Sequence, residues 1–482
     1  YNQCSANSTD ATNALEAELA PKLAAHTDAI RLDSALYWRI AQLHDQRETL
    51  DLTPEQRYLV ERHYTEMTLA GAGLDEVQKA RLSELNARIS TLETTFEKNL
   101  LADTNDLAVV IDDPAELDGL TPGELSAAAQ AAADRGLDGK HLVTLVLPTG
   151  HPWLENLTNR ATRERIMAAS RARGSRDGAH DNRPVLLELV RLRAERAELL
   201  GFANHAAFVT ADQTAQSPER VAAMLERLAP AAARNAAAEQ AKLEALAGHP
   251  IEAHDWAHYS EKVRKAEYDV DLGELRPYFE AERVLQRGVF AAATKVYGIT
   301  FTERTDLQGY TDDVRVFEVR NEDGSDLGLY LLDLYTRDSK RGGAWMNELI
   351  GQNTLLGHPT VVVNNLNVPK PAAGEPTLLT FDEVNTFFHE FGHALHGLFA
   401  HVTYPRFTGT NVYRDFVEFP SQVNEMWMLW PEIVNDYAVH HVTGEPIPAE
   451  VLDRVRSAQL WGEGFATSEY LAAALLDQAW HT

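Results

Sequence analysis

Apolar residues recur every three or four positions along much of this chain, and this spacing limits the possible folds more than any other feature. Residues 82–101, LSELNARISTLETTFEKNLL, show the pattern most clearly. Side chains at this spacing share one face of an α-helix, because a helix has about 3.6 residues per turn. The segment therefore predicts an amphipathic helix with one face on a core. The apolar positions are Leu82, Leu85, Ile89, Leu92 and Phe96.

The same pattern returns in four further segments with charged, alanine-rich faces and only short breaks between them. A short strand is predicted at Leu142–Leu147, and we find no repeat of fixed period that would indicate a solenoid. We therefore predict a mainly α fold in which residues 1–297 form a helical lobe. The four segments are 153–172, 183–201, 217–247 and 259–273.

The pattern changes after about residue 298. Residues 314–335 alternate around the turn NEDGSD and predict a β-hairpin, and residues 360–367, TVVVNNLN, predict a further strand. Helical spacing returns from about Asp382 to the end. We expect a second lobe, residues 298–482, with a small sheet beside helices.

Composition excludes several classes of protein. The chain has 72 acidic and 44 basic residues, a formal net charge of −28, which would repel nucleic acid and an anionic membrane surface. Cys4 is the only cysteine, so no internal disulfide can form. With neither a signal peptide nor an apolar run near the roughly 20 residues that span a bilayer, we expect a cytoplasmic protein.

The stretch FFHEFGHALHGLF, residues 387–399, contains the spacing H-E-x-x-H. Thr380 followed by Glu383 predicts a capping box that starts a helix through this stretch. His389 and His393 then share one face, while Glu390 lies about 100° to the side. This is the spacing with which two histidines bind zinc and a glutamate acts as general base.

A third ligand downstream would strengthen the prediction of a metal site, since catalytic zinc usually has three protein ligands. Residues 409–427, GTNVYRDFVEFPSQVNEMW, place Asp415, Glu418 and Glu425 on one predicted helix face among apolar neighbours. Glu418 follows His393 by 25 residues, which leaves room for a second helix to pack back on the first. Two histidines and one glutamate with an open fourth position are typical of catalytic zinc.

The neighbouring polar residues allow more than one interpretation. Ligating histidines usually donate their other ring nitrogen to a carboxylate, which makes Asp415 and Glu425 candidates, although both could instead form ordinary salt bridges. His396 follows His393 by three positions, but we expect a packed or hydrogen-bonded histidine there and not another ligand.

These motifs together resemble the thimet oligopeptidase family of zinc peptidases and, within it, the bacterial peptidyl-dipeptidases or dipeptidyl carboxypeptidases. The similarity extends over nearly the whole chain. Besides the two segments above, the resemblance is carried by KRGGAWMNELI at 340–350, NLNVPKPAAGEPTLLTFDEV at 365–384 and EYLAAALLDQAWH at 469–481.

Carried over residue by residue, the resemblance implies one Zn²⁺ per chain with His389, His393 and Glu418 as ligands and Glu390 as general base. It also implies two helical lobes flanking a deep channel, with the zinc on its floor and the short sheet along one wall. Residues 298–482 would then be the catalytic lobe. Such a channel would admit short unfolded peptides and exclude folded proteins, so we expect a monomer with peptide partners.

The resemblance also predicts a fragment that lacks both termini of the family. Members continue past the position of Thr482 and begin before that of Tyr1, so the truncated chain alone could bind zinc without being a full catalyst. Three functions follow: a zinc metallopeptidase that releases dipeptides from the C-terminus of oligopeptides, an endo-acting oligopeptidase, or a non-catalytic peptide-binding fragment. The presence of all four site residues argues against the third.

Overall fold

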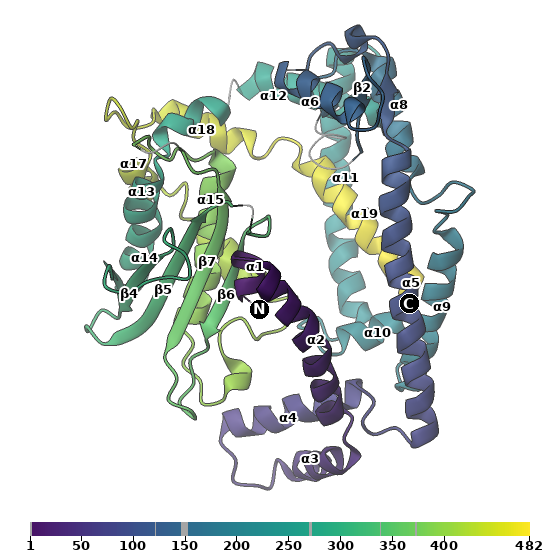
Figure 1. Ribbon diagram of the computed structural model, residues 1–482, viewed down its shortest axis with the longest axis vertical. Helices are drawn as coiled ribbons and strands as arrows, with labels where there is room; N and C mark the ends of the chain where they lie inside the picture. The colour runs from purple at the N-terminus through teal and green to yellow at the C-terminus, as the bar shows by residue number, and fades with distance from the viewer. Residues whose placement is uncertain (1, 121, 146–152, 269–271, 338, 372–373) are drawn as a thin grey trace. The chain divides into compact units, whose positions relative to one another are not determined.

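The chain forms two compact units, each assembled from separate stretches of sequence. The computed structural model describes residues 2–120, 122–145, 153–268, 272–337, 339–371 and 374–482 (Figure 1). We call one compact unit the sheet unit and the other the helical unit. The sheet unit contains residues 1–73, 212–214 and 271–452, and the helical unit contains residues 74–211, 215–270 and 453–482.

The helical unit is built from long helices with strong local start signals. Asp75 caps the longest of them, α5, through a capping box with Gln78, and Ser217 caps α11, which ends at the left-handed Gly248. The helices are α5 (Glu76–Asp106), α6 (Pro122–Ala133), α8 (Arg160–Ala172), α9 (Arg183–Leu199), α10 (His205–Thr210), α11 (Pro218–Ala247), α12 (Ala253–Tyr268) and α19 (Glu463–His481), with a 3₁₀ turn η1 (Pro114–Leu117).

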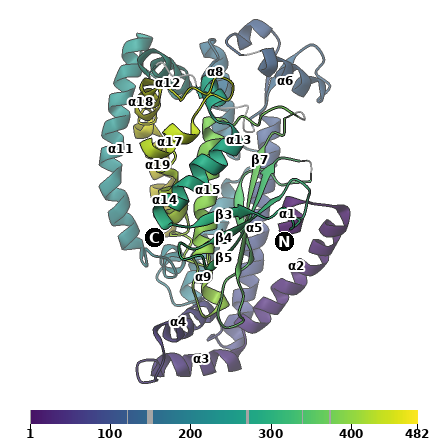
Figure 2. The same ribbon diagram turned by 90° about the vertical axis from the view of Figure 1, so that its left-hand side faces the viewer.

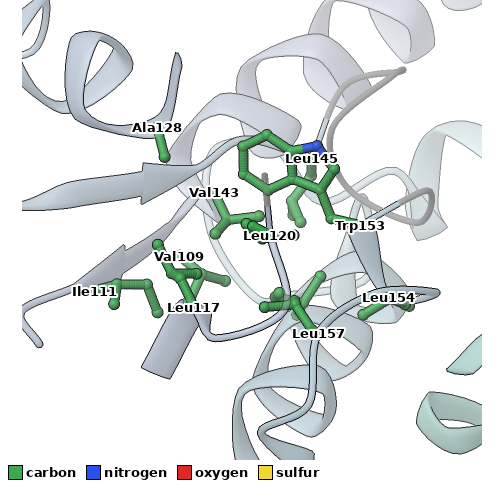
Figure 3. Close-up of a cluster of buried hydrophobic side chains, with 11 residues drawn as sticks. Val109, Ile111, Leu117, Leu120, Ala128, Val143, Leu145, Trp153, Leu154 and Leu157 are labelled. Atoms are coloured by element: carbon green, nitrogen blue, oxygen red, sulfur yellow. The ribbon is translucent and has the colours of Figure 1, made fainter. Parts of the chain in front are cut away.

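One core of the helical unit surrounds a small antiparallel ribbon. The strands β1 (Val109–Ile111) and β2 (His141–Val143) pair there, and Figure 3 shows Leu117 and Trp153 among their side chains. The buried members of this cluster are Val109, Ile111, Leu117, Leu120, Ala128, Val143, Leu145, Trp153, Leu154, Leu157 and Ile166.

The sheet unit contains five strands in the order β3-β4-β5-β7-β6. β4 and β5 form an antiparallel hairpin, β5 and β7 are parallel, and β6 pairs antiparallel with β7 and is an edge strand. The register places Met346 of β6 opposite Asn364 of β7. The strands are β3 (Thr300–Glu303), β4 (Arg315–Arg320), β5 (Asp326–Tyr335), β6 (Trp345–Ile350) and β7 (Thr360–Val368).

Helices of the sheet unit come from both ends of its sequence. The α-helices are α1 (Asn2–Ala6), α2 (Asp10–Arg31), α3 (Ser34–Gln46), α4 (Pro54–Leu69), α13 (Ala281–Arg283), α14 (Phe290–Tyr297), α15 (Phe381–Leu398), α16 (Glu418–Glu425) and α17 (Pro431–Tyr437). Short turns are η2 (Leu272–Tyr278), the π-turn η3 (Val284–Val289) and η4 (Pro405–Phe407), while α18 (Ala449–Ala458) crosses the boundary between the units.

Helix α15 packs along β7, β6 and β5, as the two views of the ribbon agree (Figures 1 and 2). Tyr330 of β5 meets Phe391 of α15 edge to face, with ring centroids 5.2 Å apart. Phe387, Phe391 and Leu398 are fully buried in this contact region. One face of α15 therefore belongs to the core, which leaves the opposite face for polar residues.

The predicted mainly α fold with a small sheet is confirmed, as are the hairpin of β4 and β5 and the strand β7. Only part of the strand predicted at Leu142–Leu147 appears, as β2, and residues 146–152 lie outside the described residues. The helix predicted over 153–172 begins later, at Arg160, because Asn159 caps it there. Among the described helices, none has the length and apolarity to cross a bilayer.

Candidate metal centre

Helix α15 starts where the sequence predicts, because its first turn satisfies its own backbone groups. The Glu383 N–H donates to Thr380 Oγ1 at 3.1 Å, and the Thr380 N–H donates to Glu383 Oε2 at 2.7 Å. This capping box gives acceptors to two backbone N–H groups that otherwise have no partner at the start of a helix. The helix then runs without a break through His389, Glu390 and His393 to Leu398.

Two buried side-chain amides, one from β7 and one from α16, form hydrogen bonds to the backbone of α15. Asn364 of β7 donates its Nδ2 hydrogen to the Glu390 carbonyl at 2.7 Å, and Asn424 of α16 donates to the Phe388 carbonyl at 2.6 Å. These carbonyls flank His389 in the sequence. Since both amides are buried, their hydrogen bonds restrict both the rotation and the translation of the helix at the site.

The close approach of α16 to α15 depends on Gly392. A Cβ built on this glycine would lie 2.6 Å from Ser421 Cα and 2.8 Å from Asn424 Cβ, both shorter than real contacts. The two helices can therefore touch backbone to backbone only because position 392 has no side chain. This contact brings the first residue of α16, Glu418, to the polar face of α15.

The three predicted ligands lie together at this place. Glu418 Oε2 lies 3.2 Å from His389 Nε2 and 3.1 Å from His393 Nε2. The three potential ligand atoms are all within 4.8 Å of one another, and among the described residues no other group of three or more His, Cys, Asp or Glu side chains is so arranged. Two nitrogens and one carboxylate oxygen suit Zn²⁺, which binds both in tetrahedral sites.

The second ring nitrogen of His389 has a carboxylate partner. His389 Nδ1 lies 2.7 Å from Glu425 Oε1, and the Asn385 amide donates to Glu425 Oε2 at 3.3 Å. A proton on Nδ1 would be shared with Glu425, so the lone pair of Nε2 is directed toward the cluster. Glu425, one of the two candidate carboxylate partners that the sequence offers, therefore contacts His389.

Glu390 is buried beside the cluster. Its side chain is 6% exposed, and Oε2 has no hydrogen-bond partner among the described residues. Burial raises the pKa of Glu390 to about 7, against a lowering by His389 and with a further rise from Glu418. A buried carboxylate oxygen without a partner is costly unless a ligand, a water or a proton satisfies it.

His393 shows the same need for a partner. Burial lowers its pKa, which favours the neutral ring that metal binding requires. Its Nε2 faces Glu418, whereas its Nδ1 has no hydrogen-bond partner among the described residues. The donor set and the partnerless Glu390 oxygen together fit a metal ion with an adjacent water.

Asp415 differs from the prediction in its position. The sequence places it on one helix face with Glu418 and Glu425, but α16 begins only at Glu418, so Asp415 lies in the turn before it. Its Oδ1 accepts a hydrogen bond from the Thr214 backbone N–H at 2.9 Å, and its own N–H donates to Gln213 Oε1 at 3.4 Å. These contacts hold the segment that leads into Glu418.

The connection between α15 and α16, residues 399–417, is anchored mainly by α4. Glu55 accepts a hydrogen bond from the Thr403 N–H at 2.7 Å, and Arg406 Nε donates to Glu66 at 2.9 Å. No sequence pattern links residues so far apart. The position of α16 therefore depends on contacts with a helix more than 300 residues earlier in the chain.

His396 is not part of the cluster, as the sequence predicts. It lines an apolar cavity of about 570 Å³ formed by the second half of α15, the following connection and α16. Burial lowers its pKa. Phe399, Val412, Phe416 and Phe419 share the lining.

Several residues of the site escape the sequence reasoning. Asn364, Asn424 and Gly392 act through contacts between elements, and no spacing rule reveals them. Ser421 follows Glu418 by three positions, which is about one helical turn, and this spacing is the one sequence signal that places it near Glu418.

The chain is similar to known peptidases over nearly its whole length. Residues 153–482 match the sequence model of Peptidase family M3. The chain is 41% identical over 481 residues to a dipeptidyl carboxypeptidase of Escherichia coli, covering 99% of this chain and 71% of that protein. Identity is 42% over the same length with the dipeptidyl carboxypeptidase of Salmonella typhimurium, again 99% and 71% of the two chains. Oligopeptidase A of Salmonella typhimurium is 34% identical over 490 residues, covering 98% and 71%.

Proposed function

Because the chain belongs to peptidase family M3, we propose that it releases dipeptides from the C-terminus of oligopeptides by hydrolysis at one zinc ion. The chain is a metallopeptidase of this family, and the proposal concerns its substrates and the roles of its residues. His389, His393 and Glu418 are the proposed ligands, and Glu390 is the proposed general base. The observation that carries the proposal is the convergence of three ligand atoms within 4.8 Å beside a buried glutamate.

The exo-acting reading is favoured over the endo-acting one by the degree of similarity. Identity is 41–42% with proteins named dipeptidyl carboxypeptidase and 34% with oligopeptidase A, at the same coverage of the relatives. An endo-acting oligopeptidase remains the second candidate, because it would use the same four residues. A non-catalytic peptide-binding fragment is the third.

Each residue of the site has a distinct task. Zinc, when bound, supplies a Lewis acid that makes water acidic and polarises the carbonyl of the bond to be cleaved. Glu390 accepts the proton of the attacking water and returns it to the nitrogen of the leaving amine. A carboxylate with a pKa raised toward neutrality by burial can do both, because its protonated and ionised forms are then close in energy.

The supporting residues keep this arrangement in place. Glu425 accepts a hydrogen bond from the Nδ1–H of His389 and so keeps Nε2 free as a ligand atom. For Asp415 we propose an indirect supporting role, since it holds the turn before Glu418 against Thr214. The amides of Asn364 and Asn424 fix the backbone on either side of His389.

The edge strand β6 offers a way to hold the substrate. An extended peptide could add to its free edge as a further strand, with main-chain hydrogen bonds that do not depend on side chains. We further propose two lobes, residues 1–297 and 298–482, flanking a channel that admits short unfolded peptides. We place the protein in the cytoplasm as a monomer, and its charge of −28 disfavours nucleic acid and anionic membranes.

The test compares three versions of one oligopeptide: unmodified, amidated at the C-terminus, and acetylated at the N-terminus. A peptidyl-dipeptidase should cut the unmodified and acetylated peptides two residues from the C-terminus and cut the amidated one at least about tenfold more slowly. An amidated peptide lacks the C-terminal carboxylate, so the enzyme group that pairs with this charge in a buried site is left without its partner. Mass spectrometry of the products shows the position of cleavage. Equal cleavage of all three at internal bonds would replace the proposal by the endo-acting alternative, and no cleavage would support the peptide-binding one.

A further inference from the structure

The third ligand lies on the least constrained part of the site. Glu418 is the first residue of α16, a helix of eight residues whose start has no side-chain cap. Its side chain is 53% exposed, compared with 25% for His389 and 12% for His393. A glutamate has three side-chain torsions, so an exposed one loses considerable rotamer freedom when it is held in one conformation.

One buried hydroxyl contacts the atom of Glu418 that matters. Ser421 Oγ lies 2.9 Å from Glu418 Oε2, the same oxygen that faces both histidine Nε2 atoms. Ser421 is fully buried. Ser421 therefore contacts the proposed ligand atom from α16, whereas the two histidines contact it from α15.

The serine itself cannot move away from this position. Its Cα lies in the backbone contact with Gly392, where even one added methyl group would be 2.6 Å away. Asn424, one turn further along α16, is tied to the Phe388 carbonyl at 2.6 Å. The contact that joins the two helices therefore also fixes the position of Ser421 relative to α15.

An ordinary helical hydrogen bond competes for the same proton. Ser421 Oγ is also 2.9 Å from the Glu418 backbone carbonyl, a bond that serines in many helices make. A hydroxyl has one proton, and a hydrogen bond to a carboxylate is roughly twice as strong as one to a neutral carbonyl. The carboxylate oxygen also has two lone pairs, so it can accept the hydroxyl and still face the cluster.

We propose that Ser421 is a positioning residue, which selects the conformation of Glu418 in which Oε2 faces His389 and His393. It does not contact substrate. The hydrogen bond holds the carboxylate in place before a metal ion arrives, so less freedom is lost on binding. This inference rests on the proposed zinc site and predicts an effect on metal affinity, not only on activity.

The test measures zinc affinity of the purified, metal-depleted protein by competition with a chelator of known affinity. Ser421→Ala should weaken zinc binding by about 10- to 100-fold, the usual effect of removing a partner of a ligand. Ser468→Ala is the matched control, since Ser468 of α19 donates to the Gly464 carbonyl of its own helix, at 2.7 Å, in the same way that many helical serines do. The control should bind zinc as the unchanged protein does.

A double-mutant cycle separates positioning from a general structural effect. If Ser421 acts through Glu418, adding Ser421→Ala to Glu418→Ala should not lower the affinity further. An affinity within about twofold of the unchanged protein for Ser421→Ala, or an equal loss in both backgrounds, would overturn the inference and leave the zinc site intact. Failure of the unchanged protein to bind zinc would overturn the proposed function itself.

Discussion

The two helices of the site are built in different ways. α15 has 18 residues, a complete capping box and a buried apolar face, and it carries two proposed ligands and the proposed base. α16 has eight residues and no side-chain cap, and it carries the third proposed ligand, Glu418, at its exposed start. The start of the first helix is specified by its own sequence, whereas the start of the second depends on contacts with other elements. Residues far apart in the chain therefore share one centre with unequal local support.

Removing one ligand from each helix gives the largest expected difference. His393→Ala should abolish stoichiometric zinc binding, because the remaining His389 and Glu418 then lie on separate helices. Glu418→Ala should weaken zinc but leave a two-histidine site on α15 that still binds it detectably. Metal analysis and chelator competition measure both. Equal affinities for the two variants would show that α16 contributes as much preorganised binding as α15.

Glu390→Gln tests the base that only α15 carries. The amide has nearly the shape of the carboxylate but cannot accept a proton, so kcat should fall by about 10²–10⁴-fold while zinc is retained. Peptide turnover and zinc content are measured on the same preparation. Near-normal turnover would exclude Glu390 as the base, and loss of zinc would mean that it is a ligand.

Gly392→Ala tests the contact between the two helices. The added methyl group meets backbone and Cβ atoms of α16, so the helices must separate, at a cost of about 1–3 kcal/mol in the free energy of unfolding. Zinc affinity should fall as well, since Glu418 moves with α16. Denaturant unfolding with and without zinc measures both effects. Gly397→Ala, on the same helix, is an instructive comparison, because its Cβ would meet the side chains of Val362 and Glu348 and not α16.

Thr380→Ala should have the smallest effect and only on α15 itself. Loss of the cap should lower the free energy of unfolding by about 1 kcal/mol, because the Glu383 N–H loses its acceptor. Zinc affinity should change little, since the ligands lie more than two turns away. If Thr380→Ala lowered zinc affinity as much as Gly392→Ala does, the start of α15 would also control the geometry of the ligands, and the expectation of a purely local effect would be wrong.

Much of the fold could be predicted from spacing alone. The helix α5, the hairpin of β4 and β5, the strand β7 and the start of α15 at Thr380 all follow from patterns within one segment. The sequence was less informative where a helix start depends on a neighbour. The spacing predicts Asp415 on the same helix as Glu418, yet α16 begins three residues later, after a turn held by Thr214.

The sequence by itself determined the arrangement of His389, Glu390 and His393, because residues one and four apart on a helix have a known geometry wherever the helix lies. It also indicated Glu418 as a candidate, without placing it. Only the tertiary structure decided that Glu418 Oε2 lies 3.1–3.2 Å from both histidines, that Glu425 Oε1 lies 2.7 Å from His389 Nδ1, and that Ser421 contacts the same Glu418 carboxylate. These distances depend on the path of residues 399–417 and on how closely α16 approaches Gly392. Helix geometry is local, whereas the packing of two helices depends on every element that holds them.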